Sequence, residues 1–220
     1  MLDPVPSRIH EYADQAVSYV QRALGIKLEY DSDTLPVLDH YLRTVPDDQP
    51  AALQLVVATS GAYFGEVVRQ RLGGRWELGS QETEWRIVLP TGINFSPVGF
   101  VAAAIAQADL EDLDSEITAP PRMLPYVQQA LARMGEVSID DYYSLCGRLD
   151  TIEHLHEVLV AVAAQLTTID DDDLGEEVVE EIPEEMVHDP ADALTIDLAE
   201  DLPVGAVLEP LSDDPSGPVN

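Results

Sequence analysis

The sequence predicts an α+β protein: a mostly helical body over residues 1–168 with a small antiparallel three-stranded meander, followed by a disordered acidic tail over residues 169–220. Apolar residues recur every three or four positions through most of the body, and this period changes to two between Arg75 and Phe95. The tail holds 18 acidic residues, six prolines, no Lys or Arg and no aromatic residue. Such a composition buries too little apolar surface to offset the entropy lost on ordering.

The charge of the whole chain excludes two classes of function. It has 42 acidic residues against 11 Lys and Arg, a formal charge of −31 at pH 7. Electrostatic binding to nucleic acid or to an anionic membrane needs clustered basic residues, which this chain lacks. The single cysteine, Cys146, excludes an intramolecular disulfide and a multi-cysteine metal site. Without a signal-peptide pattern or a long apolar run, the sequence predicts a cytoplasmic protein.

The first segment predicts a helix and then a short strand. The helix is expected from Arg8 to Leu24, with Ser7 as its N-cap and Gly25 as its end. Its apolar positions follow helical spacing, so one side should face a core. Strict alternation over residues 26–30 then predicts a short strand.

Two further helices follow, and the second should be central. Asp33 is the expected N-cap of a short amphipathic helix. Residues 51–72 form the longest helical pattern, and its first half is apolar on nearly all sides. Gly61 and Gly65 lie one turn apart on this helix, which indicates close approach of another element.

The meander is predicted by alternation after a Gly-Gly stop. Its strands are expected at residues 75–78 and 84–89 and around residues 93–95. Trp76 and Trp85 should both be buried against the long helix.

The rest of the body is expected to be helical, apart from an acidic loop over residues 109–121. Each helix is predicted from a capping signal and an apolar stripe. The signals are Ser96-Pro97 for a helix to about Ala108, Gly135 as the end of a helix beginning near Leu124, Ser138 for a short helix to Cys146, and Asp150-Thr151-Ile152-Glu153 for a last helix.

One stretch of the chain resembles a known type of domain. Gly61, Tyr63, Gly65 and Glu66 form a G-x-Y-x-G-E pattern, and the helix ends in Leu72-Gly73-Gly74-Arg75-Trp76. These residues resemble an uncharacterised bacterial domain family in which such a helix runs into a short meander. The likeness covers roughly residues 50–105 and implies a fold but no activity. No catalytic residue or cofactor is therefore predicted from it.

The side chains that could bind a metal ion or act as a nucleophile have simpler structural explanations. His154 and His156 are two apart on a helix, so they point away from each other and cannot share a metal ion. Cys146 has no neighbouring histidine in the sequence and is expected to be a buried apolar residue. The run from Asp170 to Glu181 matches a calcium loop only in part, because Leu174 stands where an oxygen ligand is needed.

Tyr63 and Glu66 allow two interpretations. They could face a groove beside Trp76, or Tyr63 could pack on the meander while Glu66 pairs locally with Arg69 or Gln70. Because an aromatic residue at helical spacing usually belongs to a core, the second interpretation is favoured.

Within the tail, one segment is typical of a partner-binding sequence. Apolar and acidic residues mix between residues 194 and 202, and three leucines stand four apart. Acidic and apolar segments of this kind bind grooves with basic rims, although the same composition also suits a solvating tail. The predicted contact residues are Leu194, Ile196, Asp197, Leu198, Glu200, Asp201 and Leu202.

The sequence therefore predicts a non-enzymatic interaction or regulatory protein whose acidic tail engages a protein partner with a basic surface. Two alternatives remain open. One is a small hydrolase or metal-dependent enzyme that uses His154 or His156 with neighbouring acids. The other is an acidic mimic of nucleic acid that competes for a basic partner.

Overall fold

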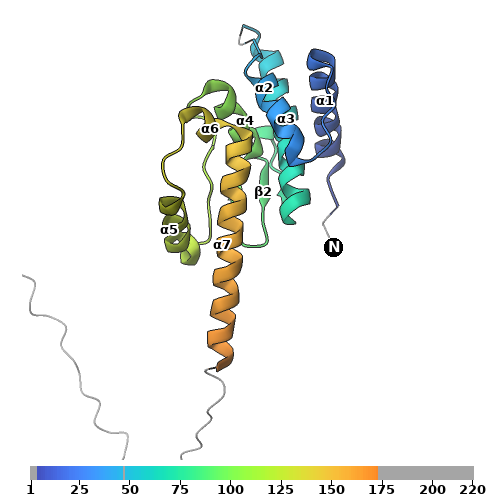
Figure 1. Cartoon of the computed structure of the whole chain (residues 1–220). Coiled ribbons are helices and arrows are strands. Elements are labelled where there is room, and N and C mark those ends of the chain that lie inside the picture. The colour runs from blue at the N-terminus through green and yellow to red at the C-terminus, as the bar shows by residue number, and fades with distance from the viewer. Residues whose placement is uncertain (1–3, 47, 173–220) are drawn as a thin grey trace, which may run out of the picture. The chain divides into compact units, whose positions relative to one another are not determined.

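The computed structural model describes residues 4–46 and 48–172, and within them it confirms the predicted α+β fold (Figure 1). Of the predicted acidic tail, residues 173–220 lie outside those described. The elements in chain order are α1 (Ser7–Leu24), α2 (Leu35–Leu42), α3 (Pro50–Leu72), β1 (Arg75–Glu77), β2 (Arg86–Val88), β3 (Asn94–Phe95), α4 (Pro97–Ala106), α5 (Leu124–Met134), α6 (Ile139–Tyr143) and α7 (Leu145–Asp172).

Helix α3 is the centre of the body, as its apolar composition predicts. Every residue from Ala58 to Arg69 is buried. Helix α1 packs along α3, α4 crosses it, and α7 packs against α2, α4 and α5. Among the described residues, α3 is the one helix long and apolar enough to cross a membrane. Because more than half of its apolar window is buried by the rest of the body, it serves as a core helix.

The two glycines of α3 allow the close approach that their spacing predicts. A Cβ atom at Gly61 would lie 2.8 Å from the Cα atom of Val98, at the start of α4. A Cβ atom at Gly65 would overlap the indole ring of Trp76. Gly61 thus permits the crossing of two helix backbones, and Gly65 makes room for a side chain of the sheet.

The sheet is antiparallel with the order β1-β2-β3, and Trp76 lies opposite Ile87. Its second strand is shorter than the alternation predicts. Glu84 belongs to a 3₁₀ turn at residues 82–84, where its carboxylate accepts the N–H groups of Ser80 and Gln81. This local bonding holds Glu84 out of the ladder, and strand β2 begins at Arg86.

Two predictions in the first segment are wrong. Residues 26–30 form no strand, because Tyr30 adopts φ 59° and donates its N–H to the hydroxyl of Tyr63 at 3.1 Å. An extended ladder is incompatible with that backbone conformation. Helix α1 already includes Ser7, and Pro6 occupies the cap position without a side-chain hydrogen bond.

The start of α2 also differs from the prediction. Asp31, rather than Asp33, accepts the N–H of Thr34 at 3.0 Å and caps a 3₁₀ turn that leads into the helix. The two aspartates are both chemically suited to capping. The loop conformation after Tyr30 decides between them.

The start of α7 lies five residues before the predicted capping box at Asp150. Asp39 of α2 accepts the backbone N–H groups of Leu145 at 2.8 Å and Cys146 at 3.2 Å. The Ser144 hydroxyl accepts the N–H of Gly147 at 2.9 Å. A side chain from another helix therefore satisfies donors that a helix start leaves free. At its other end α7 continues to Asp172, past the predicted boundary at 168.

Candidate functional site

An apolar groove of about 950 Å³ lies beside α3 and α4. The first half of α3 and the second half of α4 form its floor, and two loops form its walls. The apolar residues lining it are Ala51, Leu53, Leu55, Val57, Ala58, Val98, Ala102, Ile105, Ala106, Leu110 and Leu113. Leu55 and Leu110 are 40% and 37% exposed, so apolar surface is accessible from solvent. A groove of this kind suits the apolar side of a ligand.

One wall is a tight turn with an apolar base and an acidic tip. The N–H of Leu113 donates to the carbonyl of Leu110 at 3.2 Å, which closes the turn. Both leucines line the groove. Glu111 and Asp112 occupy the tip and are exposed. The turn thus presents Leu110 and Leu113 to the groove and carries two exposed acidic residues between them.

The opposite wall contains Glu82 in the 3₁₀ turn. Arg8 of α1 donates to the Glu82 carboxylate, and so does the Tyr12 hydroxyl, at 3.2 Å. The Arg8 guanidinium also lies over the ring of Trp85, 5.2 Å from its centroid. These contacts connect the turn to α1 and pair the Glu82 carboxylate with the Arg8 guanidinium.

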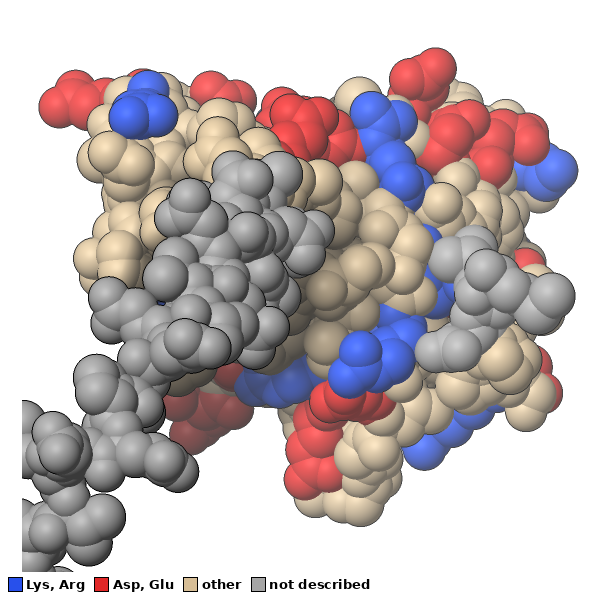
Figure 2. Space-filling view, turned by 90° about the horizontal axis from the view of Figure 1, so that it is seen from below, with Lys and Arg blue, Asp and Glu red and all other residues tan. Residues whose placement is uncertain are grey.

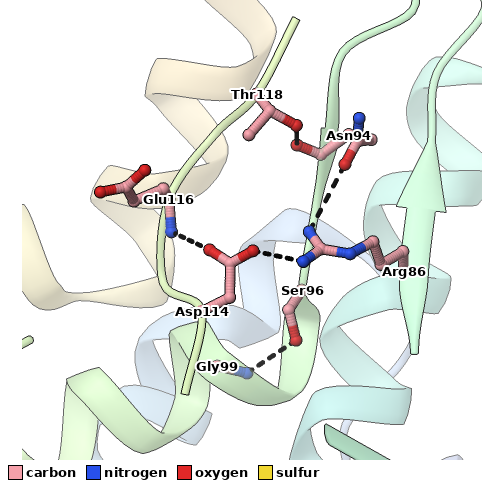
Figure 3. Close-up of polar contacts among 7 residues, drawn as sticks. All are labelled: Arg86, Asn94, Ser96, Gly99, Asp114, Glu116 and Thr118. Atoms are coloured by element: carbon pink, nitrogen blue, oxygen red, sulfur yellow. Dashed lines mark hydrogen bonds and ion pairs between the residues drawn. The ribbon is translucent and has the colours of Figure 1, made fainter. Parts of the chain in front are cut away.

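An ion pair attaches the acidic turn to the sheet (Figure 3). Arg86 of β2 donates to Asp114, and its other terminal nitrogen lies 3.4 Å from the side-chain oxygen of Asn94. The N–H of Glu116 donates to Asp114 at 2.9 Å. Burial opposes ionisation of Asp114, but the Arg86 and Glu116 donors outweigh it and lower the pKa of this carboxyl. Asp114 is therefore ionised at neutral pH.

Backbone contacts on either side of Asp114 strengthen this attachment. Thr118 and Asn94 exchange backbone hydrogen bonds of 2.8 and 2.9 Å, which adds a bridge beside β3. Ser96 caps α4 by accepting the N–H of Gly99, as Figure 3 shows. A Cβ atom at Gly99 would overlap the carbonyl of Asp114, so the glycine permits the loop to cross the start of α4.

The G-x-Y-x-G-E residues form buried structure and line no part of the groove. Glu66 and Arg69 are 2% and 6% exposed and make a two-pronged ion pair of 2.9 and 3.0 Å. The indole N–H of Trp76 also donates to Glu66, at 2.5 Å. Arg69 thus supplies the local partner that the sequence indicates for Glu66. Trp76 is half-buried, whereas Trp85 is completely buried.

Tyr63 packs against a different element from the one expected. Its ring lies 5.0 Å from that of Tyr30, and its hydroxyl lies 2.9 Å from the hydroxyl of Thr34. The residues before α2, rather than the meander, therefore cover it. Burial raises the pKa of the Tyr63 hydroxyl, which keeps this group neutral.

The histidine and cysteine side chains occupy separate surroundings. The Nδ1 atom of His156 lies 3.1 Å from the Thr91 hydroxyl, and burial lowers the pKa of His156. Burial, followed by the neighbouring Asp39, raises the pKa of Cys146 to about 12. A thiol with that pKa is a poor nucleophile at neutral pH. Among residues 4–46 and 48–172, no three His, Cys, Asp or Glu side chains are placed to hold a metal ion.

The predicted contact residues of the tail, from Leu194 to Leu202, lie outside the described part of the chain, as does most of the calcium-loop pattern. Sequence reasoning missed the groove. Its signal was the pair of leucines that flank two acids in the predicted loop, at positions 110–113. That pattern becomes meaningful only once the loop is folded against α4.

Comparisons with protein-family models, curated proteins and solved structures find no match to this chain. The resemblance to an uncharacterised bacterial domain family therefore remains a prediction.

Proposed function

We propose that the protein is a non-enzymatic interaction module that binds a basic amphipathic helix of a partner protein in the groove. The observation that carries this proposal is an apolar groove lined by Leu110 and Leu113, the two ends of a turn that exposes the carboxylates of Glu111 and Asp112. Helices bind grooves through apolar residues spaced three and four apart. Lys and Arg beside that apolar ridge would then face the carboxylates of this turn.

The charge of the body supports the choice of a basic partner. Basic residues on the face seen in Figure 2 lie among acidic ones. Six of the 11 Lys and Arg side chains are paired with acids. Residues 1–168 hold 24 acids, so unpaired carboxylates remain in excess. Such a field accelerates association with a cationic partner.

The acidic tail is part of the same proposal. Its 18 carboxylates would attract the basic residues of the partner, and the segment from Leu194 to Leu202 would add apolar contacts. We also propose a cytoplasmic location, because the apolar helix α3 is buried in the core of the body.

A designed peptide tests the groove. We would measure, by fluorescence anisotropy, the Kd of the full chain for a labelled helix of about five turns with a leucine ridge and Lys on both flanks. Leu110→Lys should weaken binding by at least about tenfold, because it removes apolar contact and adds repulsion. Leu131→Lys is the matched control, since Leu131 is 44% exposed and lies outside the groove. Equal effects of the two substitutions would refute the groove as the binding site.

A second comparison separates the tail from the groove. A chain that ends after Asp172 retains all of α7 and lacks residues 173–220, so its loss of affinity reports on that part of the tail. We expect the truncated chain to bind the peptide more weakly than the full chain does. Its Kd should also change less as the salt concentration rises from about 0.05 to about 0.15 M, where the Debye length is about 8 Å. Unchanged affinity and salt dependence would remove the tail from the proposal and leave the groove.

A further inference from the structure

A second, smaller hollow lies beside the first half of α3. Its volume is about 430 Å³, and its walls come from the last turns of α1, from α2 and from α3. Leu55 of α3 lines both this hollow and the groove, so the two cavities are neighbours. The apolar and aromatic residues lining the hollow are Tyr19, Ala23, Tyr41, Ala52, Leu55 and Val56.

The part of α3 that borders the hollow is uncharged and partly exposed. No Asp, Glu, Lys or Arg occurs from Gln49 to Gly65. Ala52 is exposed, and Leu55 is 40% exposed. Contiguous exposed apolar surface without charge is typical of an interaction site. A ligand in the hollow would therefore contact hydrocarbon on the side of α3.

The charged residue that lines the hollow is a cation without a counterion. Arg22 is exposed in the last turn of α1, and no carboxylate of residues 4–46 and 48–172 forms an ion pair with it. The groove differs in this respect, because its charged lining residue, Glu82, is already paired with Arg8. The Arg22 guanidinium can therefore bind an anionic group of a ligand.

Tyr41 offers a second hydrogen-bond donor to the same ligand. Within the described part of the chain its hydroxyl has no hydrogen-bond partner, whereas the hydroxyl of Tyr19 donates to Gln15 at 3.3 Å. A guanidinium and a hydroxyl both donate to carboxylate oxygens. Apolar walls with these two donors fit an apolar side chain that lies next to a carboxylate.

We propose that the hollow binds a helix of a partner protein that carries an acidic residue beside its apolar ridge. The ridge would pack on Leu55 and Val56, in the way that amphipathic helices bind apolar grooves. The carboxylate would accept hydrogen bonds from Arg22 and Tyr41. This site goes beyond the proposed function, because it selects the opposite charge from the one that the groove selects.

The test uses the full chain and a labelled helix of about four turns with a leucine ridge, one Glu beside the ridge and no other charge. Fluorescence anisotropy measures its Kd. Arg22→Glu should raise this Kd about fivefold, because it removes an ion pair and adds repulsion. Arg133→Glu is the matched control and should leave the Kd unchanged. Arg133 is also exposed in the last turn of a helix, α5, and it lies outside the hollow.

Two further variants separate the hollow from the groove. Leu110→Lys should leave the affinity for the Glu peptide unchanged, although it weakens binding of the basic helix. Leu55→Gln should raise the Kd of both peptides, because Leu55 lines both cavities. If the basic helix does not bind while the Glu peptide follows this pattern, the proposal for the groove fails and the proposal for the hollow holds.

Each other result contradicts the proposal. Equal effects of Arg22→Glu and Arg133→Glu would reduce the contribution of Arg22 to overall charge. A peptide with Gln at the Glu position that binds as tightly would refute the carboxylate contact, and so would the absence of binding by the wild-type chain. A dimer in sedimentation velocity that Leu55→Gln dissociates would show that a second copy covers the hollow. Circular dichroism of each variant establishes that it is folded.

Discussion

The buried ion pair between Glu66 and Arg69 provides a quantitative test of the packing around α3. Glu66→Leu would leave the Arg69 guanidinium buried without a carboxylate, since the two side chains are only 3% and 7% exposed. Breaking a buried pair by removing one partner costs about 3–5 kcal/mol. For a protein of this size, 1 kcal/mol lowers Tm by about 2–4 °C, so Tm should fall by about 6–20 °C.

Replacing both members should restore most of the lost stability. Glu66→Leu with Arg69→Met substitutes apolar side chains for both charges, a change that is often neutral in other proteins. The double variant should therefore lie within about 1–2 kcal/mol of the wild-type protein. Urea unfolding followed by tryptophan fluorescence measures all four members of this double-mutant cycle.

An exposed pair serves as the control. Arg75 and Glu77 form an ion pair of 2.7 Å with side chains 51% and 55% exposed. Arg75→Met should cost less than about 1 kcal/mol. The reasoning is refuted if Glu66→Leu costs no more than this control, or if the effects of the two core substitutions simply add.

Four further outcomes follow from local contacts. Gly65→Val should destabilise the protein by about 1–3 kcal/mol and displace Trp76, and a shift of the tryptophan fluorescence would report that displacement. An unchanged spectrum and stability would contradict the contact between Gly65 and the Trp76 ring. Asp39→Ala should cost about 1–3 kcal/mol in urea unfolding, because it leaves two N–H groups of α7 without their acceptor, and Asp39→Asn should cost less. Burial lowers the pKa of His156, so the folded state resists protonation of this side chain. The free energy of unfolding should therefore fall as pH drops below about 6.5, and unfolding measured at several pH values should show a weaker pH dependence for His156→Gln. Because burial raises the pKa of Cys146 to about 12, iodoacetamide at neutral pH should alkylate the native thiol far more slowly than the unfolded one, and equal rates would refute its burial.

Local signals accounted for most of the helices. Ser96 and Ser138 cap helices as expected, and Gly25, Gly73 and Gly135 end them. These interactions join residues only a few positions apart, so residue type and spacing are enough to predict them. The alternation around Trp85 and Ile87 likewise depends on a period that the chain itself displays.

The candidate site was not predictable in the same way. The groove needs Leu110 beside α4, and the loop that carries it is joined to the sheet by the ion pair between Arg86 and Asp114, residues 28 positions apart. No periodicity selects this arginine over the others or this aspartate over its acidic neighbours. The predicted binding residues were instead sought in the tail, where composition departs most from that of a globular domain.

What the sequence determined by itself was therefore most of the helices, the three strands of the meander, the central position of α3 and the negative charge of the protein. The tertiary structure decided where α7 begins, because Asp39 binds N–H groups 106 and 107 positions away and takes precedence over the local capping pattern at Asp150. It also turned an acidic loop into the wall of an apolar groove. The physical reason is the range of the interactions: capping and periodicity act within a few residues, whereas burial and ion pairing depend on which distant segments the folded chain brings together.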